Sequence, residues 1–147
     1  MAITIAQMAD ALTTTLGAAA TVARAESYDE LTEGIHDYPM LQVYWQGTAN
    51  DVSGNDDRTT YRGGVRQKEY TFYCDYYARP RSELAEDNAA VTNGADALEA
   101  VLEVQNTKPY FGLAGIKAFR WTGERVAFDY GGTLYAGCRY VLTLRVF

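Results

Sequence analysis

Histidine and cysteine are scarce in this chain, which has one histidine, His36, and two cysteines, Cys74 and Cys138, among 147 residues. A structural zinc site needs a full tetrahedral set of nitrogen or sulfur ligands, so these residues are too few to predict one. The two cysteines are far apart in the sequence and form no CxxC motif. Both fall where the sequence has strand character, so we expect small buried thiols rather than a disulfide.

Long apolar runs are also absent, so the sequence predicts no membrane-spanning helix. The first residues lack the basic start and apolar core of a signal peptide, which favours a protein made and kept in a cytosol. Hydrophobic residues make up 48% of the chain and aromatic residues 13%, which excludes a disordered tail. At this length we expect a single domain over residues 1–147 with its own core.

The motifs of common active sites are missing as well. No serine stands in a GxSxG motif, and neither Gly63–Gly64 nor Gly131–Gly132 opens a helix after a strand, as a phosphate-binding loop does. The polar run NDVSGNDD at residues 50–57 lacks the residue order of a calcium loop. We therefore expect no enzymatic activity, no bound metal and no cofactor. A small hydrolase or ligand-binding domain stays open only because a fold does not fix a function.

Charge is present but unevenly distributed. The net charge is −6, yet residues 26–57 hold eight acidic residues and no basic one, while residues 58–81 hold six basic residues against Glu69 and Asp75. One interpretation is that both blocks are simply solvated. The other is that they are complementary patches which meet across copies of the same chain, where charge sets register and partner choice.

The first half of the chain predicts one helix and two strands. An apolar stripe at spacings of three and four residues indicates a helix over residues 4–24, with Thr4 as its N-cap. Alternation predicts a half-buried strand over residues 40–46, and composition predicts a loop over 47–57. Residues 59–77 read as a long extended segment. The two strands and the polar loop between them predict a long β-hairpin arm.

The second half predicts a helix and three strands. The helix is expected to begin at Ser82 and to run to about residue 105, with a kink or break at Asn93 and Gly94. Segments 116–121 and 125–130 flank the sequence TGE, which we expect to be a hairpin turn, and the chain ends in a further strand. The strands are expected to place two sets of residues on single faces: Leu41, Val43 and Trp45 in one, and Tyr70, Phe72, Cys74 and Tyr76 in the other.

This order of elements predicts an α+β domain. Two helices are expected to cover one face of a mainly antiparallel sheet that includes the long β-hairpin arm. A sheet of this kind leaves its second face and its edges free for partners.

The stretch YRGGVRQKEYTFYCDYYARPR, residues 61–81, is the strongest candidate for binding. Basic side chains interleaved with aromatic rings are typical of surfaces that bind single-stranded nucleic acid. One hypothesis is therefore that the chain is a nucleic-acid-binding accessory protein that uses residues 58–81. Strands rich in tyrosine and phenylalanine are also what a packed sheet requires. A protein partner is favoured, because tyrosine and arginine are enriched at the energetic centres of interfaces.

The order of helix, strand, polar loop, long strand, helix and C-terminal strands resembles that of the tail terminator, or tail completion, proteins of long-tailed bacteriophages. The close of the chain, GGTLYAGCRYVLTLRVF, is similar to theirs: glycine, an aromatic residue, a small residue with glycine, then an alternating terminal strand. The strand EYTFYCDYYAR followed by a helix rich in alanine, leucine and acidic residues also fits.

The resemblance implies a structural virion protein of the phage neck, assembled in the host cytoplasm. Such proteins form six-membered rings that cap the tail tube and offer a surface to the head connector, and DNA passes through their channel without specific binding. Another neck or tail-tube subunit is the nearest alternative. On this hypothesis the subunit contact involves Arg58, Arg62, Arg66, Lys68, Tyr73, Tyr77 and Arg79. The loop that faces a neighbouring ring or the lumen carries Asp51, Asp56 and Asp57.

Overall fold

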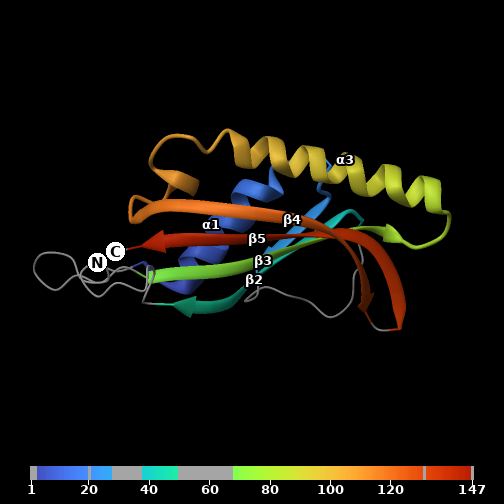
Figure 1. The fold of residues 1–147 in the computed structure, drawn as a ribbon, viewed down its shortest axis with the longest axis horizontal. Coiled ribbons are helices and arrows are strands. Elements are labelled where there is room, and N and C mark those ends of the chain that lie inside the picture. Colours follow the sequence, from blue (N-terminus) through green and yellow to red (C-terminus); the bar gives the residue numbers. More distant parts are fainter. Residues whose placement is uncertain (1–2, 20, 28–37, 50–67, 131, 147) are drawn as a thin grey trace, which may run out of the picture.

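The computed structural model describes residues 3–19, 21–27, 38–49, 68–130 and 132–146. Within these residues the chain forms a five-stranded sheet and two α-helices (Figure 1). The helices are α1 (Ile5–Gly17) and α3 (Leu84–Glu103), with a short 3₁₀ turn η2 (Tyr110–Gly112). The strands are β1 (Arg24–Ser27), β2 (Met40–Ala49), β3 (Lys68–Pro80), β4 (Ile116–Tyr130) and β5 (Thr133–Val146). The predicted α+β class is confirmed.

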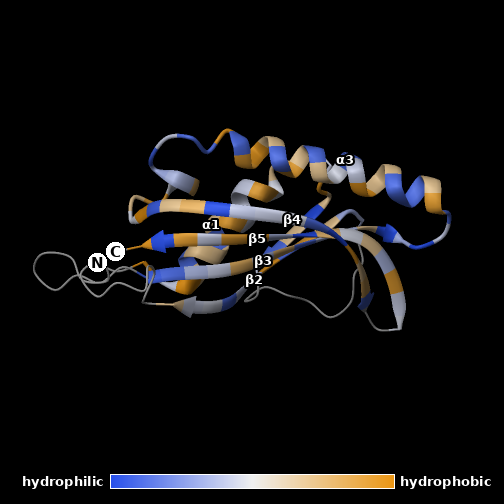
Figure 2. Cartoon of the chain, viewed as in Figure 1, coloured by the Kyte–Doolittle hydropathy of each residue, from blue (hydrophilic) through white to orange (hydrophobic). Residues whose placement is uncertain are grey.

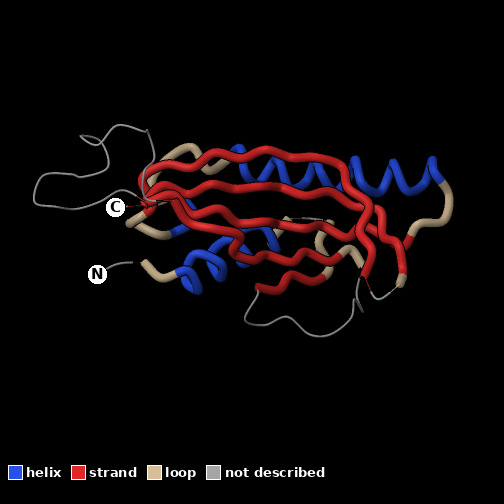
Figure 3. Tube along the Cα trace, turned by 60° about the horizontal axis from the view of Figure 1, so that its bottom comes forward, coloured by secondary structure: helices blue, strands red, loops and turns tan. Residues whose placement is uncertain are grey.

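The sheet has the order β1-β2-β3-β5-β4, so β3 is its central strand and β4 is one of its two border strands. β1 runs parallel to β2, and every other neighbouring pair is antiparallel. β5 pairs with β3 on one side and with β4 on the other along nearly its whole length. Figure 3 shows the five strands side by side, with both helices behind the same face.

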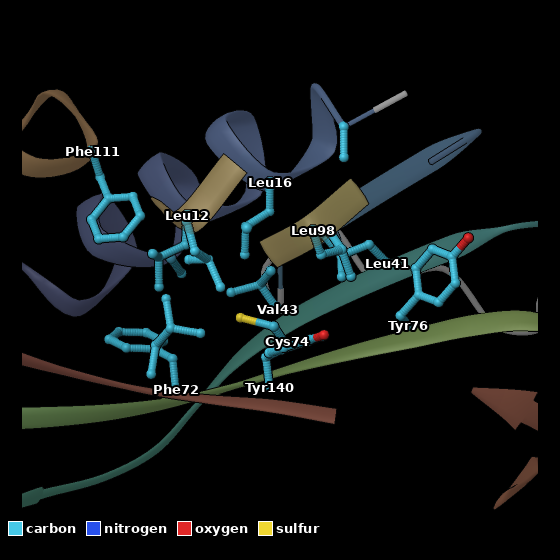
Figure 4. Close-up of a cluster of buried hydrophobic side chains, with 14 of the residues drawn as sticks. Leu12, Leu16, Leu41, Val43, Phe72, Cys74, Tyr76, Leu98, Phe111 and Tyr140 are labelled. Atoms are coloured by element: carbon cyan, nitrogen blue, oxygen red, sulfur yellow. The ribbon is translucent and has the colours of Figure 1, made fainter. Parts of the chain in front are cut away.

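Both helices pack on one face of the sheet, as predicted. Leu12 and Leu16 of α1 and Leu98 of α3 belong to the same buried cluster as Phe72 and Cys74 of β3 (Figure 4). Polar and apolar residues alternate along α3 in Figure 2, because only one side of that helix meets the core. Tyr70, Phe72, Cys74 and Tyr76, which were predicted to share one face of their strand, all face this cluster.

Helix α1 begins where the sequence indicates and ends earlier. The Thr4 hydroxyl accepts a hydrogen bond from the Gln7 backbone N–H, and the Gln7 side chain accepts one from the Thr4 backbone N–H, which completes a capping box. The helix ends at Gly17, so its predicted extension to residue 24 is wrong. Arg24–Ser27 forms β1 instead, because pairing with β2 satisfies its backbone.

Helix α3 is continuous across Gly94, where a kink or break was expected. A Cβ atom at Gly94 would lie 2.2 Å from Cε2 and 2.6 Å from the hydroxyl of Tyr76. The glycine is therefore a point of close approach, where the Tyr76 ring of β3 packs directly against the helix backbone. Tyr76 itself is buried, and burial raises its pKa.

Strand β4 is also continuous, so the predicted hairpin turn over residues 122–124 is wrong. Gly123 lies within the strand, and a Cβ there would meet the Tyr140 ring at 2.4 Å. The β4–β5 hairpin closes after Tyr130, which pairs with Thr133, and Gly132 takes a positive φ of 84°. A left-handed backbone conformation of this kind favours glycine, so Gly132 suits the turn between β4 and β5.

Strands β2 and β3 pair in antiparallel fashion, as predicted, with Leu41 opposite Tyr76 and Val43 opposite Cys74. β2 continues to Ala49, so the predicted loop begins too early. Trp45 lies opposite Phe72 and so shares a face with Leu41 and Val43, as predicted, although 45% of Trp45 is exposed; a bulge follows it. The described parts of both strands lie within the sheet, and the intervening residues 50–67 lie outside the described part of the chain. The long hairpin arm therefore stays a prediction.

Substitution of Gly94 by alanine tests the contact with Tyr76. Alanine normally favours a helix by roughly 1 kcal/mol over glycine, but overpacking of a core costs about 1–3 kcal/mol. We expect Gly94→Ala to lower the free energy of unfolding by about 1–2 kcal/mol in urea denaturation followed by circular dichroism. Asn93→Ala, on the exposed side of the same turn, is the matched control and should be neutral or stabilising. Equal or greater stability of Gly94→Ala would contradict the close approach.

The two cysteines predict a dependence of stability on pH. Both are free and buried, as expected, and burial raises the pKa of Cys138 to about 12 and that of Cys74 further still. Above the ordinary thiol pKa of about 8.5 the unfolded chain loses protons that the folded chain keeps. The free energy of unfolding should therefore fall as pH rises from there, by up to about 1.4 kcal/mol per pH unit for each thiol.

Urea denaturation at several pH values between about 8 and 9.5, below the range where exposed tyrosines ionise, measures this slope. The variant carrying both Cys74→Ala and Cys138→Ala should show a flatter slope than the wild-type chain, whatever its absolute stability. Identical slopes for the two proteins would rule out the thiols as the cause.

Candidate protein interface

The face of the sheet opposite the helices carries polar and aromatic side chains. No helix of the described residues lies on this face, which is turned toward the viewer in Figure 3. Its centre holds Tyr44 of β2, Tyr73 and Asp75 of β3, and Arg139 of β5, which the pairing register brings next to one another. We call these four residues the Asp75 cluster.

Asp75 and Arg139 form a two-pronged ion pair at the centre of this face. Nε of Arg139 donates to Oδ1 of Asp75 at 2.7 Å, and an amino group of Arg139 donates to Oδ2 at 3.2 Å. The hydroxyl of Tyr44 donates to the same Oδ2 at 2.9 Å. Asp75 is only 2% exposed, so these bonds replace the water that its carboxylate loses.

Aromatic rings surround the guanidinium of Arg139. Its central carbon lies 4.4 Å from the centre of the Tyr73 ring and 5.6 Å from that of Phe128, distances at which a cation is attracted to a ring face. The hydrogen bond to Asp75 raises the pKa of Arg139, and burial together with the Asp75 charge raises the pKa of Tyr44. The cluster is thus charge-balanced and fixes the relative positions of three strands.

A second apolar cluster, separate from the main core beneath the helices, lies on the helix-free face near the β4–β5 turn. It consists of Met40, Tyr77, Phe128 and Tyr135, all of which are buried. The ring centres of Tyr77 and Phe128 lie 4.6 Å apart, and those of Tyr77 and Tyr135 lie 5.8 Å apart. Tyr77, one of the residues predicted to contact a neighbouring subunit, is therefore packed inside its own domain.

Near the opposite end of the strands, two arginines converge on one carboxylate. Arg120 of β4 donates to both carboxylate oxygens of Glu69 at 3.2 and 3.3 Å, and Arg145 of β5 donates to one of them at 3.3 Å. Glu69 is largely covered, whereas 66% of the Arg120 side chain is exposed. This end of the helix-free face therefore has a surplus of positive charge at its border.

The border strand β4 leaves one side of its backbone unpaired within the described residues. It pairs with β5 on one side only, and among the described segments the one backbone hydrogen bond outside that pairing is from Ile116 N–H to the Leu113 carbonyl. In Figure 3 it forms the outer margin of the sheet. A border strand with free N–H and C=O groups is a surface on which another strand can pair.

The residues predicted to form the subunit contact are spread over different environments. Lys68 is exposed at the start of β3, Tyr73 is half-buried beneath Arg139, and Tyr77 is buried. Arg79 lies against the start of α3, where Nη1 is 3.3 Å from a Glu86 oxygen and Nε is 3.3 Å from Oδ1 of Asp87. Arg58, Arg62, Arg66, Asp51, Asp56 and Asp57 lie outside the described part of the chain.

Sequence reasoning missed both ion-paired groups on this face. The alternation does place Asp75 and Arg139 away from the core face of their strands. What the sequence does not give is the pairing register, which sets Asp75 opposite Arg139 and Glu69 opposite Arg145. Cross-strand pairs of opposite charge would have been the signal, once the order β3-β5 was known.

No protein-family model matches the chain, and no curated protein is similar to it at a meaningful level. The described residues contain no group of three or more histidine, cysteine, aspartate or glutamate side chains placed to hold a metal ion. Neither described helix has the length and apolar character needed to cross a membrane.

Removal of the Asp75 carboxylate tests the central ion pair. We expect Asp75→Ala to lower the free energy of unfolding by roughly 2–4 kcal/mol, because it leaves Arg139 half-buried without its counter-ion. Tyr44→Phe, which removes one hydrogen bond, should cost about 0.5–1.5 kcal/mol. Glu86→Ala breaks an ion pair at an exposed site and should cost less than about 1 kcal/mol. Urea denaturation of the three variants gives the ranking, and an Asp75→Ala cost no larger than that of Glu86→Ala would contradict it.

Proposed function

We propose that this chain is a structural virion protein of the phage neck, which forms a ring that caps the tail tube and docks to the head connector. By its resemblance to tail terminator proteins the ring is hexameric, and DNA passes through it without specific binding. The α+β fold supports the proposal, because two helices on one face leave the other face and a border strand for contacts with proteins. The partners are copies of the same chain, the tube protein and the connector protein.

The observation that carries this proposal is the border strand β4, which pairs with a described strand on one side only. Fifteen residues long, β4 is the longest strand described, and its outer side meets no other described strand. Natural proteins generally shorten, cover or charge such borders to prevent unwanted pairing. β4 does carry charged residues, Arg120 among them, but it is long and its apolar residues Phe119 and Trp121 stay partly exposed, which suits a subunit that works inside an assembly.

The nucleic-acid hypothesis receives less support from the same strands. It needs the rings of residues 58–81 on an accessible surface where bases can stack. Phe72 and Tyr76 are buried beneath the helices, and Tyr77 is buried in the second apolar cluster on the helix-free face. Tyr73 packs under Arg139. These rings serve the fold, so the basic block between Arg58 and Arg81 lacks a stacking surface from them.

Charge reversal in the basic block tests whether it forms a subunit contact. We expect the variant with Arg66→Glu and Lys68→Glu to lose ring assembly while its monomer stays folded, because like charges would then face the acidic block of a neighbour. Size-exclusion chromatography with light scattering, at low and high salt, measures the mass of the assembly. Negative-stain electron microscopy shows whether the particles are rings.

The matched control is the triple variant Asn106→Asp, Thr107→Asp and Lys108→Glu, at exposed positions outside both that block and β4, which changes the net charge equally and should leave rings intact. Normal rings from the Arg66 and Lys68 variant would mean that the basic block is merely solvated. A wild-type protein that is monomeric at every salt concentration, and that fails to sediment with assembled tail tubes, would refute the proposed function itself.

A further inference from the structure

The first half of β4 separates two hollows that lie on opposite faces of the sheet. Ala118, Phe119 and Arg120 line both of them. The hollow on the helix side is completed by Gln105, Tyr110 and Trp121 and has a volume of about 450 Å³. The hollow on the helix-free side is completed by Glu69, Thr143 and Arg145 and has a volume of about 180 Å³. Both are lined by β4, whose outer side pairs with no other described strand.

The hollow on the helix side has aromatic walls held in fixed positions. The Phe119 ring makes edge contacts with Tyr110 and Phe111, with ring centres 5.3 and 4.9 Å apart. The Gln105 side-chain oxygen accepts a hydrogen bond from the Phe111 backbone N–H at 2.9 Å, which ties the η2 turn to the end of α3. Rigid aromatic walls favour an apolar side chain as the occupant.

The hollow on the helix-free side is basic. Arg120 and Arg145 share the single carboxylate of Glu69, which leaves one positive charge in excess. A guanidinium has five N–H donors, and Arg120, mostly exposed, uses two of its bonds on Glu69. The remaining donors favour an acidic side chain as the occupant.

We propose that the first half of β4 binds an extended segment of a partner protein as an additional strand of the sheet. Successive side chains of such a strand point to opposite faces, so an apolar residue enters the aromatic hollow while its neighbour, an acidic residue, meets Arg120. Backbone hydrogen bonds to β4 supply affinity, and the two hollows supply specificity for alternating apolar and acidic residues. The inference rests on the proposed function in one respect: the partner is a virion subunit other than a second copy of this chain.

A short fluorescein-labelled peptide in which glutamate alternates with leucine and valine is the probe, with binding measured by fluorescence anisotropy. Two further peptides carry N-methyl groups on alternate residues, one on the glutamates and the other on the apolar residues. In an added strand only every second N–H faces β4. We therefore expect one N-methylated peptide to lose binding and the other to bind within about twofold of the parent peptide. Equal effects of the two N-methylated sets would overturn strand addition.

Charge variants of β4 test the basic hollow. Arg120→Glu should weaken binding of the glutamate peptide by roughly five- to twentyfold and should favour a peptide with lysine in place of glutamate. Arg125→Glu is the matched control, because it lies on the same strand, is also exposed and lines neither hollow. Its affinity for the glutamate peptide should match that of the wild-type protein. If both variants weaken peptide binding equally, the loss of affinity comes from the change in net charge, and Arg120 does not contact the acidic side chain of the peptide.

Lack of saturable binding at about 1 mM peptide would overturn the proposal, since a strand site of useful strength binds more tightly than that. If no peptide binds and Arg120→Glu also changes the mass of the assembly, the proposal fails in a specific way: a second copy of the chain, and not a different subunit, occupies the border. Ring assembly without peptide binding would refute this strand site while leaving the proposed function supported. Peptide binding by a protein that never forms rings would support the strand site and refute the proposed function.

Discussion

The pairing of β3 on both of its sides is the constraint on which the rest of this structure depends. Because β3 lies between β2 and β5, its alternation divides the molecule into two faces. Phe72, Cys74 and Tyr76 point to the helices and form the main core, while Tyr73 and Asp75 point to the other face. A register slip by one residue would exchange these two sets and would place an aspartate among leucines.

The helix-free face is stabilised by polar contacts where a helix would otherwise cover it. Arg139 and Asp75 join β5 to β3, and Tyr44 adds β2 to the same carboxylate. Phe128 and Tyr135 of the β4–β5 hairpin pack on Tyr77 at one end of this face. The polar side chains at the centre of the face therefore make their hydrogen bonds to one another. Hydrogen-bonding groups without a partner among the described strands lie at the border instead, where Arg120 is exposed and β4 pairs on one side only. That contrast is why we place the partner contacts at the border.

Close packing against glycine explains two features that local sequence patterns misrepresent. In a short window, Gly94 reads as a helix breaker and Gly123 reads as part of a turn. Each instead makes room for a tyrosine ring from a neighbouring strand, Tyr76 in the first case and Tyr140 in the second. The Tyr140 hydroxyl also donates to Glu99 of α3 at 2.6 Å, so the same ring connects the sheet to the helix. Such contacts join residues that are distant in sequence, and no local pattern contains them.

The sequence by itself determined the α+β class, the start of α1 at its capping box, the set of β3 residues that share one face, and the buried free thiols. Each of these follows from periodicity or from local hydrogen bonding, which act over a few residues. Tertiary structure alone decided that residues 24–27 form a strand, that β4 continues through Gly123, and that Asp75 meets Arg139. These features depend on strand order and register, because backbone pairing and side-chain contacts between distant segments fix them.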